Sequence, residues 1–157
     1  MTDFHPIVVH FTIGLLAVGV VLDLLSAAVN RSQYRQTASL LLGVGTACAL
    51  VAVLTGLRAA DMAEIPPEAL PLVEAHKQSG IWTLVGFVLV MITRIVLVKR
   101  QVDFRSRMAW GYHAAAVIAL ILLFRTGSLG GDMVYRYGIG TEARPAAPAE
   151  TEKPAFE

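Results

Sequence analysis

Apolar residues occur along this chain in four long, nearly continuous stretches. They run over residues 7–29, 38–57, 81–98 and 108–124. Each is close to the roughly 20 residues that a helix needs to cross the hydrocarbon core of a bilayer. The pattern therefore predicts an all-α integral membrane protein with helices over 7–29, 38–57, 72–98 and 108–125. The third helix is expected to begin before its apolar run, after the prolines of the preceding connection.

Composition supports a membrane protein. Hydrophobic residues make up 55% of the chain and charged residues 16%, with a mean hydropathy of +0.61. A soluble domain has about 25% charged residues. The net charge of +1 gives no indication of nucleic-acid binding. Cys48 is the only cysteine, so it cannot form an intrachain disulfide and is interpreted as a small packing residue.

The distribution of basic residues predicts the orientation of the helices. Both short connections are basic, whereas the long connection between the second and third helices is mainly acidic. The basic residues are Arg31 and Arg35 in the first connection and Lys99, Arg100, Arg105 and Arg107 in the last. Short loops rich in lysine and arginine stay in the cytoplasm. We therefore expect both short basic connections to lie in the cytoplasm and both termini to lie outside.

The end of the chain changes in composition. Residues 126–140 contain five glycines, and we expect this stretch to leave the fourth helix and fold back over the outer face, with Tyr135 and Tyr137 at the interface. Residues 141–157 are rich in alanine, proline and glutamate, a composition typical of disorder. The predicted organisation is a four-helix domain over 1–140 and a disordered tail over 141–157.

Two pairs of short motifs indicate an internal duplication. A histidine precedes a glycine by four residues in His10…Gly14 and in His76…Gly80, at an offset of 66 residues. Thr55-Gly-x4-Asp-Met recurs as Thr126-Gly-x4-Asp-Met, at an offset of 71 residues. The sequence therefore predicts a four-helix bundle built from two duplicated helical hairpins. A parallel repeat of this kind has its symmetry axis along the membrane normal.

The repeated histidines favour a haem b site near the outer leaflet. Helices of a bundle commonly supply imidazole ligands to haem iron, and two filled axial positions favour electron transfer. We predict His10 and His76 as the two ligands. Gly14 and Gly80, one turn further along each helix, would leave room for the porphyrin face.

Further residues of the outer layer fit the same hypothesis. Arg58, and with it Lys77, would pair with haem propionates at the rim. Thr55 or Thr126 would accept the remaining imidazole N–H and so fix the orientation of a ring. His5, just before Pro6, is interpreted as a residue that caps the helix end at the surface.

Other interpretations of the same residues stay open. Glycines spaced along apolar helices also mark close helix packing in membranes. A mononuclear zinc or copper site is an alternative to haem, although its soft and hard ligands are mixed. Its ligands would be His5, His10 and His76, with Asp61, Met62 or Met133. Asp61 and Asp132 are more typical of hydrogen-bonding residues near helix ends.

A second ionisable layer is expected near the cytoplasmic side. Asp23 and Arg94 lie at a similar depth in the first and third helices, and an opposite-charge pair lowers the cost of burying both groups. We predict that they pair and fix one helix against the other. His113, beside Tyr112, lies close to this layer; a structural role is favoured over a quinone site or a proton path.

The ends of the predicted domain resemble a known family. Three features are similar to bacterial predicted membrane proteins grouped as domain of unknown function 2231. They are the opening His5-Pro-Ile-Val-Val-His10-Phe-Thr-Ile-Gly-Leu-Leu, the aspartate Asp23 and the closing Gly130-Gly-Asp-Met-Val-Tyr-Arg-Tyr-Gly-Ile-Gly140. The resemblance covers residues 4–140. The family usually has proline where this chain has Thr12. The resemblance implies roles for His5, His10, Asp23 and the glycine-rich end, but it implies no particular activity. Some relatives are joined to Rieske or cytochrome modules, which implies a redox setting.

Taken together, the sequence favours a membrane redox subunit that passes single electrons between quinol and an external redox protein. Stand-alone catalysis has no support, because no nucleophile–base pair, CxxC motif or phosphate loop occurs. The first alternative is a cofactor-free membrane anchor or assembly subunit of a respiratory complex, which would form homo- or hetero-oligomers. A third hypothesis is transport of a metal or small solute along the layer of Asp23, Arg94 and His113.

Overall fold

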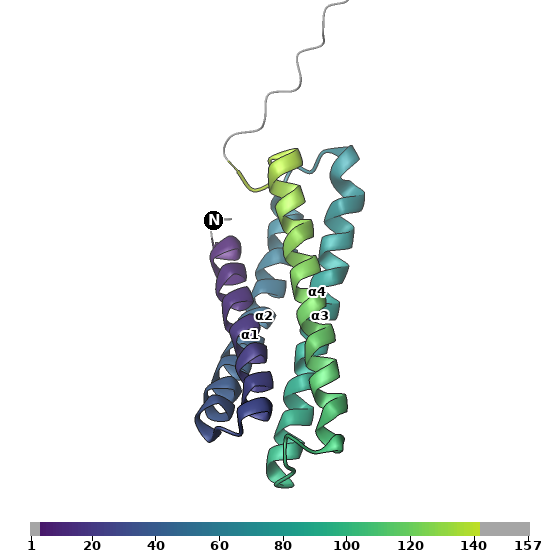
Figure 1. Ribbon diagram of the computed structural model, residues 1–157. Helices are drawn as coiled ribbons and strands as arrows, with labels where there is room; N and C mark the ends of the chain where they lie inside the picture. The colour runs from purple at the N-terminus through teal and green to yellow at the C-terminus, as the bar shows by residue number, and fades with distance from the viewer. Residues whose placement is uncertain (1–3, 142–157) are drawn as a thin grey trace, which may run out of the picture.

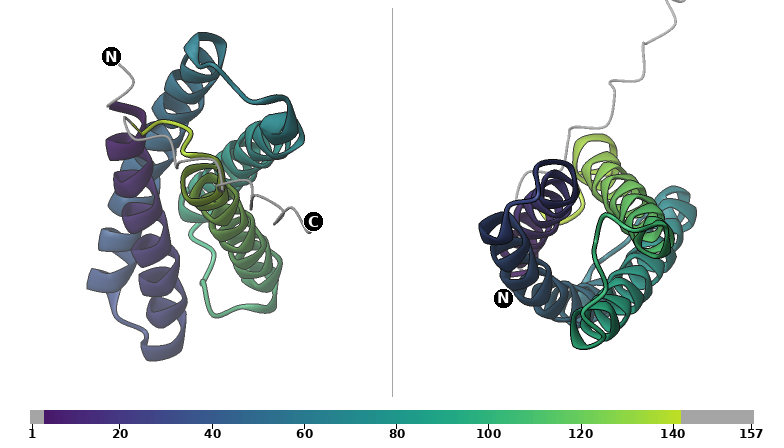
Figure 2. Two further views of the ribbon diagram at one scale, coloured as in Figure 1. Left: turned by 90° about the horizontal axis from the view of Figure 1, so that it is seen from above. Right: turned by 60° about the horizontal axis from the view of Figure 1, so that its bottom comes forward.

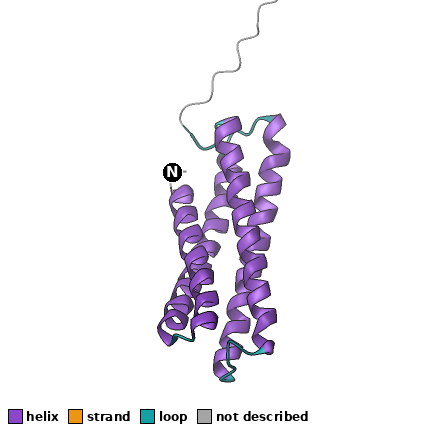
Figure 3. Cartoon of the chain, in the orientation of Figure 1, coloured by secondary structure: helices purple, strands orange, loops and turns teal. Residues whose placement is uncertain are grey.

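The computed structural model describes residues 4–141. Within them the chain forms long helices and one short 3₁₀ turn, joined by brief connections (Figure 1, Figure 3). The elements are α1 Phe4–Val29, α2 Ser32–Met62, η1 Pro67–Ala69, α3 Leu70–Lys99 and α4 Arg107–Tyr137. The prediction of an all-α four-helix bundle is confirmed.

The bundle consists of two antiparallel hairpins. α1 packs mainly against α2, and α3 mainly against α4; α2–α3 and α1–α4 contacts join the hairpins. Seen end-on, the helices form a ring in which α1 and α3 stand diagonally (Figure 2). We call the end with the N-terminus and the α2–α3 connection the terminal end, and the end with the α1–α2 and α3–α4 connections the basic-loop end (Figure 1).

All four helices are long and apolar enough to cross a membrane. They contain 26 to 31 residues, which at 1.5 Å per residue gives about 39–46 Å. A bilayer core is about 30 Å thick. Only 17–28% of the most apolar window of each helix is buried inside the bundle, so most of these apolar side chains face outward. This is the surface that contact with lipid requires.

The helices are longer than the sequence predicted. α2 begins at Ser32 and ends at Met62, so it includes polar turns at both ends of the expected span 38–57. α1 begins at Phe4 and α3 at Leu70, close to the expected starts. Apolar content predicted the membrane-crossing part of each helix, but neighbouring helices also support the polar turns beyond it.

The prediction that residues 126–140 fold back over the outer face is wrong. α4 continues through this stretch to Tyr137, and Gly138 ends it with a left-handed φ of 64°, a common conformation for a glycine after a helix. Gly127 and Gly130 lie against side chains of other helices, so their small size serves packing. Of the predicted tail over 141–157, only Thr141 belongs to the described residues.

The two hairpins are related by one register of 71 residues. Thr12, Leu16, Asp23 and Ser26 are buried in α1, and Thr83, Phe87, Arg94 and Leu97 are buried 71 residues later in α3. Ala38, Gly45 and Ala52 of α2 correspond in the same way to buried Ala109, Ala116 and Leu123 of α4. The predicted duplication is thus matched by equivalent buried faces.

Glycines bring the helices of the first hairpin close together. A Cβ on Gly45 of α2 would lie 2.7 Å from Leu16 Cδ2, and one on Gly19 of α1 would lie 3.1 Å from Leu42 Cδ2. Each leucine therefore fills the space left by a glycine on the opposite helix. Leu16 and Leu42 are both fully buried. The open interpretation of glycines as packing residues holds at these two positions.

Candidate functional site

His5 lies in the first turn of α1 and contacts α2. Its Nδ1 is 3.1 Å from Thr55 Oγ1. The Thr55 hydroxyl itself lies 2.8 Å from the carbonyl of Val51 in its own helix and donates to it. Its oxygen is then left to accept from His5 Nδ1–H. The interpretation of His5 as a surface cap is thus wrong: this half-buried imidazole joins the two helices of its hairpin.

His76 makes the corresponding contact in the second hairpin. Its Nδ1 is 3.1 Å from the carbonyl oxygen of Thr126 in α4. A carbonyl only accepts hydrogen bonds, so Nδ1 is the protonated nitrogen. Thr126 Oγ1 binds two α3 hydroxyls instead, at 2.8 Å from Ser79 Oγ and 3.0 Å from Thr83 Oγ1. Both histidines are thus fixed by the repeated threonine of the neighbouring helix.

The two imidazoles present the same nitrogen. Because Nδ1–H is held in each neutral ring, Nε2 carries the lone pair. Within residues 4–141, the hydrogen bonds of Nδ1 to the threonines are the contacts that fix each ring to the neighbouring helix. His5 and His76, which are equivalent in the 71-residue register, are therefore held in the same orientation by their neighbouring helices at the terminal end.

Glycines make room for both rings. A Cβ on Gly56 of α2 would lie 2.8 Å from His5 Cε1, closer than carbon atoms approach without displacement. A Cβ on Gly130 of α4 would lie 3.1 Å from His76 Cε1. Each imidazole thus rests against the backbone of the helix that also holds its Nδ1. In the first hairpin, the two residues of the Thr-Gly repeat therefore both contact His5: Thr55 accepts its hydrogen bond and Gly56 leaves space for its ring.

The structure does not bring His10 and His76 together. His10 is exposed, and its Nδ1 bonds the Pro6 carbonyl of its own helix at 2.6 Å. At 3.6 residues per turn, His10 lies about 160° around the helix from buried Thr12, whereas His5 lies within about 20° of it. His10 and Gly14 line an apolar hollow of about 510 Å³ on the outer surface. There is room beside Gly14, but it faces away from His76.

The other residues predicted for the haem site are scattered. Gly80 lies against α4, where a Cβ would be 3.8 Å from Thr126 Cγ2. Arg58 is exposed at the terminal end of α2. Lys77 pairs with Glu74 at 3.4 Å, so it is already neutralised within its own helix. Gly80 is thus a packing residue, and Arg58 is an exposed basic side chain at the terminal end.

The residues proposed for a zinc or copper site do not converge. No group of three or more His, Cys, Asp or Glu side chains that could hold a metal ion occurs within residues 4–141. Asp61 and Met62 are exposed at the end of α2. Asp132 pairs with Arg136 at 3.2 Å, in line with the role expected for a residue near a helix end.

The second layer forms a buried network between the hairpins. Arg94 of α3 donates from one guanidinium nitrogen to Asp23 Oδ1 and to Tyr112 Oη. Tyr112 in turn donates to Asp23 Oδ2 at 2.6 Å. Asp23 and Arg94 are each 1% exposed. The predicted ion pair is confirmed, and the α4 tyrosine is its third member.

Arg94 also fastens the start of α2. Its Nε donates to Ser39 Oγ at 3.0 Å and its second terminal nitrogen to the Arg35 carbonyl at 2.9 Å. The guanidinium lies 5.0 Å from the centroid of the Phe104 ring, within the range of a cation–π contact. Arg94 therefore binds residues from every other part of the bundle at this level.

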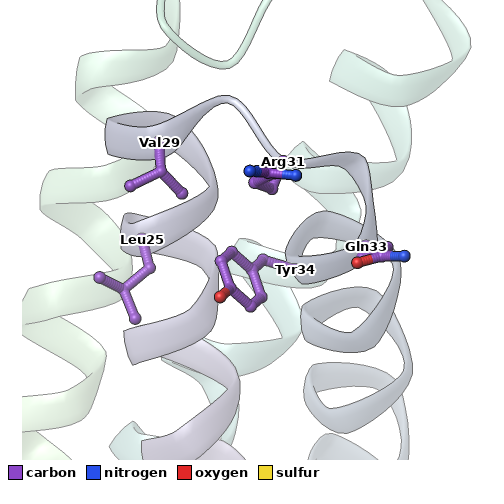
Figure 4. Close-up of a pocket in the computed structure, with 5 residues that line it drawn as sticks. All are labelled: Leu25, Val29, Arg31, Gln33 and Tyr34. Carbon is purple, nitrogen blue, oxygen red and sulfur yellow. The ribbon is translucent and has the colours of Figure 1, made fainter.

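A surface hollow of about 360 Å³ lies beside the α1–α2 connection. In Figure 4, the Tyr34 ring lies beside Leu25 and Val29, with Arg31 and Gln33 nearby. An apolar wall with a polar rim is usual where a helix hairpin meets the membrane surface. None of these residues belongs to the buried network, and we assign the hollow no chemical role.

Comparison with known proteins identifies the family. The family described as "Predicted membrane protein (DUF2231)" matches residues 2–143, which is nearly all of the chain apart from its C-terminal end. The chain belongs to this family. The resemblance noted in the sequence is thereby confirmed. No curated protein and no solved structure matches the chain. As a DUF2231 member, the chain is a multi-pass membrane protein that contacts the lipid bilayer.

The sequence contains a signal that identifies His5 as the partner of His76. The offset of 71 residues between Thr55 and Thr126 leads from His76 back to His5, not to His10. The same offset relates Asp23 to Arg94. A comparison of both motif pairs at one common offset would have found the histidine pair. Tyr112 had no such signal, since its equivalent in the first hairpin is Leu41.

Proposed function

We propose that this DUF2231 protein is a membrane electron-transfer subunit that binds one haem b at the terminal end through His5 and His76. The observation that carries the proposal is the equivalence of these two rings: each has its Nδ1–H held by the neighbouring helix and its Nε2 left as a lone pair. A haem with two such ligands supplies one-electron chemistry without an open position for a substrate.

The residues fit this cofactor in two respects. A hydrogen bond from the second ring nitrogen orients a ligating imidazole and raises its basicity, and both rings have one. Gly56 and Gly130 leave the rings in place without steric conflict. Arg58, exposed at the same end of α2, would pair with a propionate.

We further propose that the protein lies in a bacterial cytoplasmic membrane with one fixed orientation. The basic-loop end would face the cytoplasm, because Arg31, Lys99 and Arg100 lie there and short basic connections are retained on that side. The terminal end would then face an external redox protein, and quinol in the bilayer would be the electron donor. Thiol labelling of Glu64→Cys and Gln101→Cys in a Cys48→Ala background tests this: only the first should react from outside.

The cofactor is tested with the purified full chain. The protein is expressed with haem available, purified in detergent and examined by a dithionite-reduced minus oxidised visible spectrum. We expect sharp α, β and Soret bands at close to one haem per chain. A flat spectrum from folded protein made under haem-replete conditions would refute the proposal.

A second function is favoured by the network of Asp23, Arg94 and Tyr112. Its hydrogen bonds join both hairpins into one rigid unit, which is what a cofactor-free anchor or assembly subunit of a respiratory complex requires. This alternative predicts a colourless protein that copurifies with a partner. A colourless protein that migrates alone on a native gel would count against it.

A further inference from the structure

His113 has a buried ring nitrogen that the network leaves unused. Its Nε2 is 2.9 Å from the Phe104 carbonyl, and since a carbonyl only accepts, Nε2 carries the proton of the neutral ring. Nδ1 is then a bare lone pair. It is buried and has no hydrogen-bond partner within residues 4–141. Buried polar atoms normally have a partner, so this atom requires an explanation.

This nitrogen lies near a carboxylate oxygen of the buried network. His113 Nδ1 lies 3.9 Å from Asp23 Oδ2, too far for a hydrogen bond between the two acceptors. A proton on Nδ1 would change the contact into a charge-assisted interaction between imidazolium and carboxylate. The proton would give a partner to the one atom of the network that lacks one.

The charged groups around His113 favour or oppose a proton on its Nδ1. Asp23 of α1 favours it. Arg94 of α3 opposes it, as does Arg35 of α2, whose guanidinium lies 5.8 Å from the Phe104 ring centroid. Tyr112, in the same helix as His113, has its ring centroid 5.1 Å from the imidazole and donates its O–H to the carboxylate. The Asp23 carboxylate thus accepts hydrogen bonds from Arg94 and Tyr112, and His113 Nδ1 beside it can accept a proton.

His113 is less enclosed than the carboxylate beside it. The side chain of His113 is 14% exposed, whereas that of Asp23 is 1% exposed. Of the two groups, the imidazole is therefore the more accessible one.

We propose that His113 Nδ1 and Asp23 Oδ2 form a proton-binding site inside the bundle. The ligand is a proton, and the loaded state is an imidazolium held by the carboxylate that also binds Arg94. The site is separate from the histidine pair at the terminal end. It does not rest on haem binding.

Nitrogen-15 NMR of histidine-labelled full-length protein in detergent micelles tests this site. His113→Gln identifies the His113 signals, and exposed His10 serves as a reference histidine in the same sample. On acidification, we expect His113 to pass from the Nε2–H form with bare Nδ1 to a doubly protonated ring. A ring that keeps one form from neutral to acidic conditions would overturn the proposal.

Two variants distinguish proton binding at the carboxylate from general titration. Asp23→Asn removes the anion, so the doubly protonated fraction of His113 in the same acidic buffer should fall. Tyr112→Phe removes the O–H that competes for Oδ2, so this fraction should rise, and this variant serves if Asp23→Asn fails to fold. An unchanged fraction in both folded variants would show that Asp23 does not hold the proton.

Discussion

Asp23 and Arg94 occupy equivalent positions of the two hairpins, 71 residues apart, and bind each other across the centre of the bundle. The duplicated unit thus carries opposite charges in its two copies at one position. An acidic residue in both copies would place two like charges together inside the bilayer, which is costly. The difference between the copies is what allows the hairpins to associate here.

Loss of either partner should destabilise the protein strongly. Arg94→Met leaves the Asp23 carboxylate unpaired, and breaking a buried pair costs about 3–5 kcal/mol. The double variant Asp23→Leu with Arg94→Met removes both charges and should lose less stability than Arg94→Met alone. Reversible unfolding in detergent measures both. If the separate losses of Asp23→Leu and Arg94→Met add up to the loss of the double variant, the pair is not coupled.

The glycine contact in the first hairpin gives a second prediction. Gly45→Ala places a methyl group 2.7 Å from Leu16 Cδ2, and overpacking of this kind costs about 1–3 kcal/mol. Gly14→Ala is the matched control, since nothing lies within 4 Å of its added Cβ. We expect a lower midpoint of thermal unfolding for the first variant only. Similar midpoints would mean that the α1–α2 contact is looser than described.

The ring contact of His5 gives a third prediction. Gly56→Ala would displace the imidazole, because its methyl group would meet Cε1 at 2.8 Å. Gly127, at the equivalent position of α4, has only Ile13 Cδ1 nearby at 3.5 Å, an ordinary contact. The haem content of purified protein should therefore fall in Gly56→Ala and stay unchanged in Gly127→Ala. A fall in both variants would point to general damage at this end of the bundle.

Most of the fold was predictable because the apolar stretches have the length of a membrane crossing. The duplication and the pairing of Asp23 with Arg94 were also predictable, since charges inside a membrane need partners. The end of α4 was not: Gly130 suggested a turn, but its missing side chain makes room for His76. Sequence alone does not distinguish a glycine used for backbone freedom from one used for space.

The histidine pair was predicted only in part. His76 and the two threonines were identified, but His10 was chosen over His5 because it precedes a glycine by the same four residues as His76. That spacing is a local feature, whereas helix phase decides which residue faces the interior. His5 lies seven residues before Thr12, as His76 lies seven before Thr83, and both threonines are buried. The phase of these buried positions was the stronger signal.

We propose that His5 and His76, and not His10, hold a haem. The most direct test measures the haem-to-protein ratio and the reduced visible spectrum of His5→Ala, His76→Ala and His10→Ala, purified alongside the unaltered chain. We predict that the first two lose haem or its sharp α band and that His10→Ala retains both. Haem loss in His10→Ala, or full retention in His5→Ala and His76→Ala, would contradict the account.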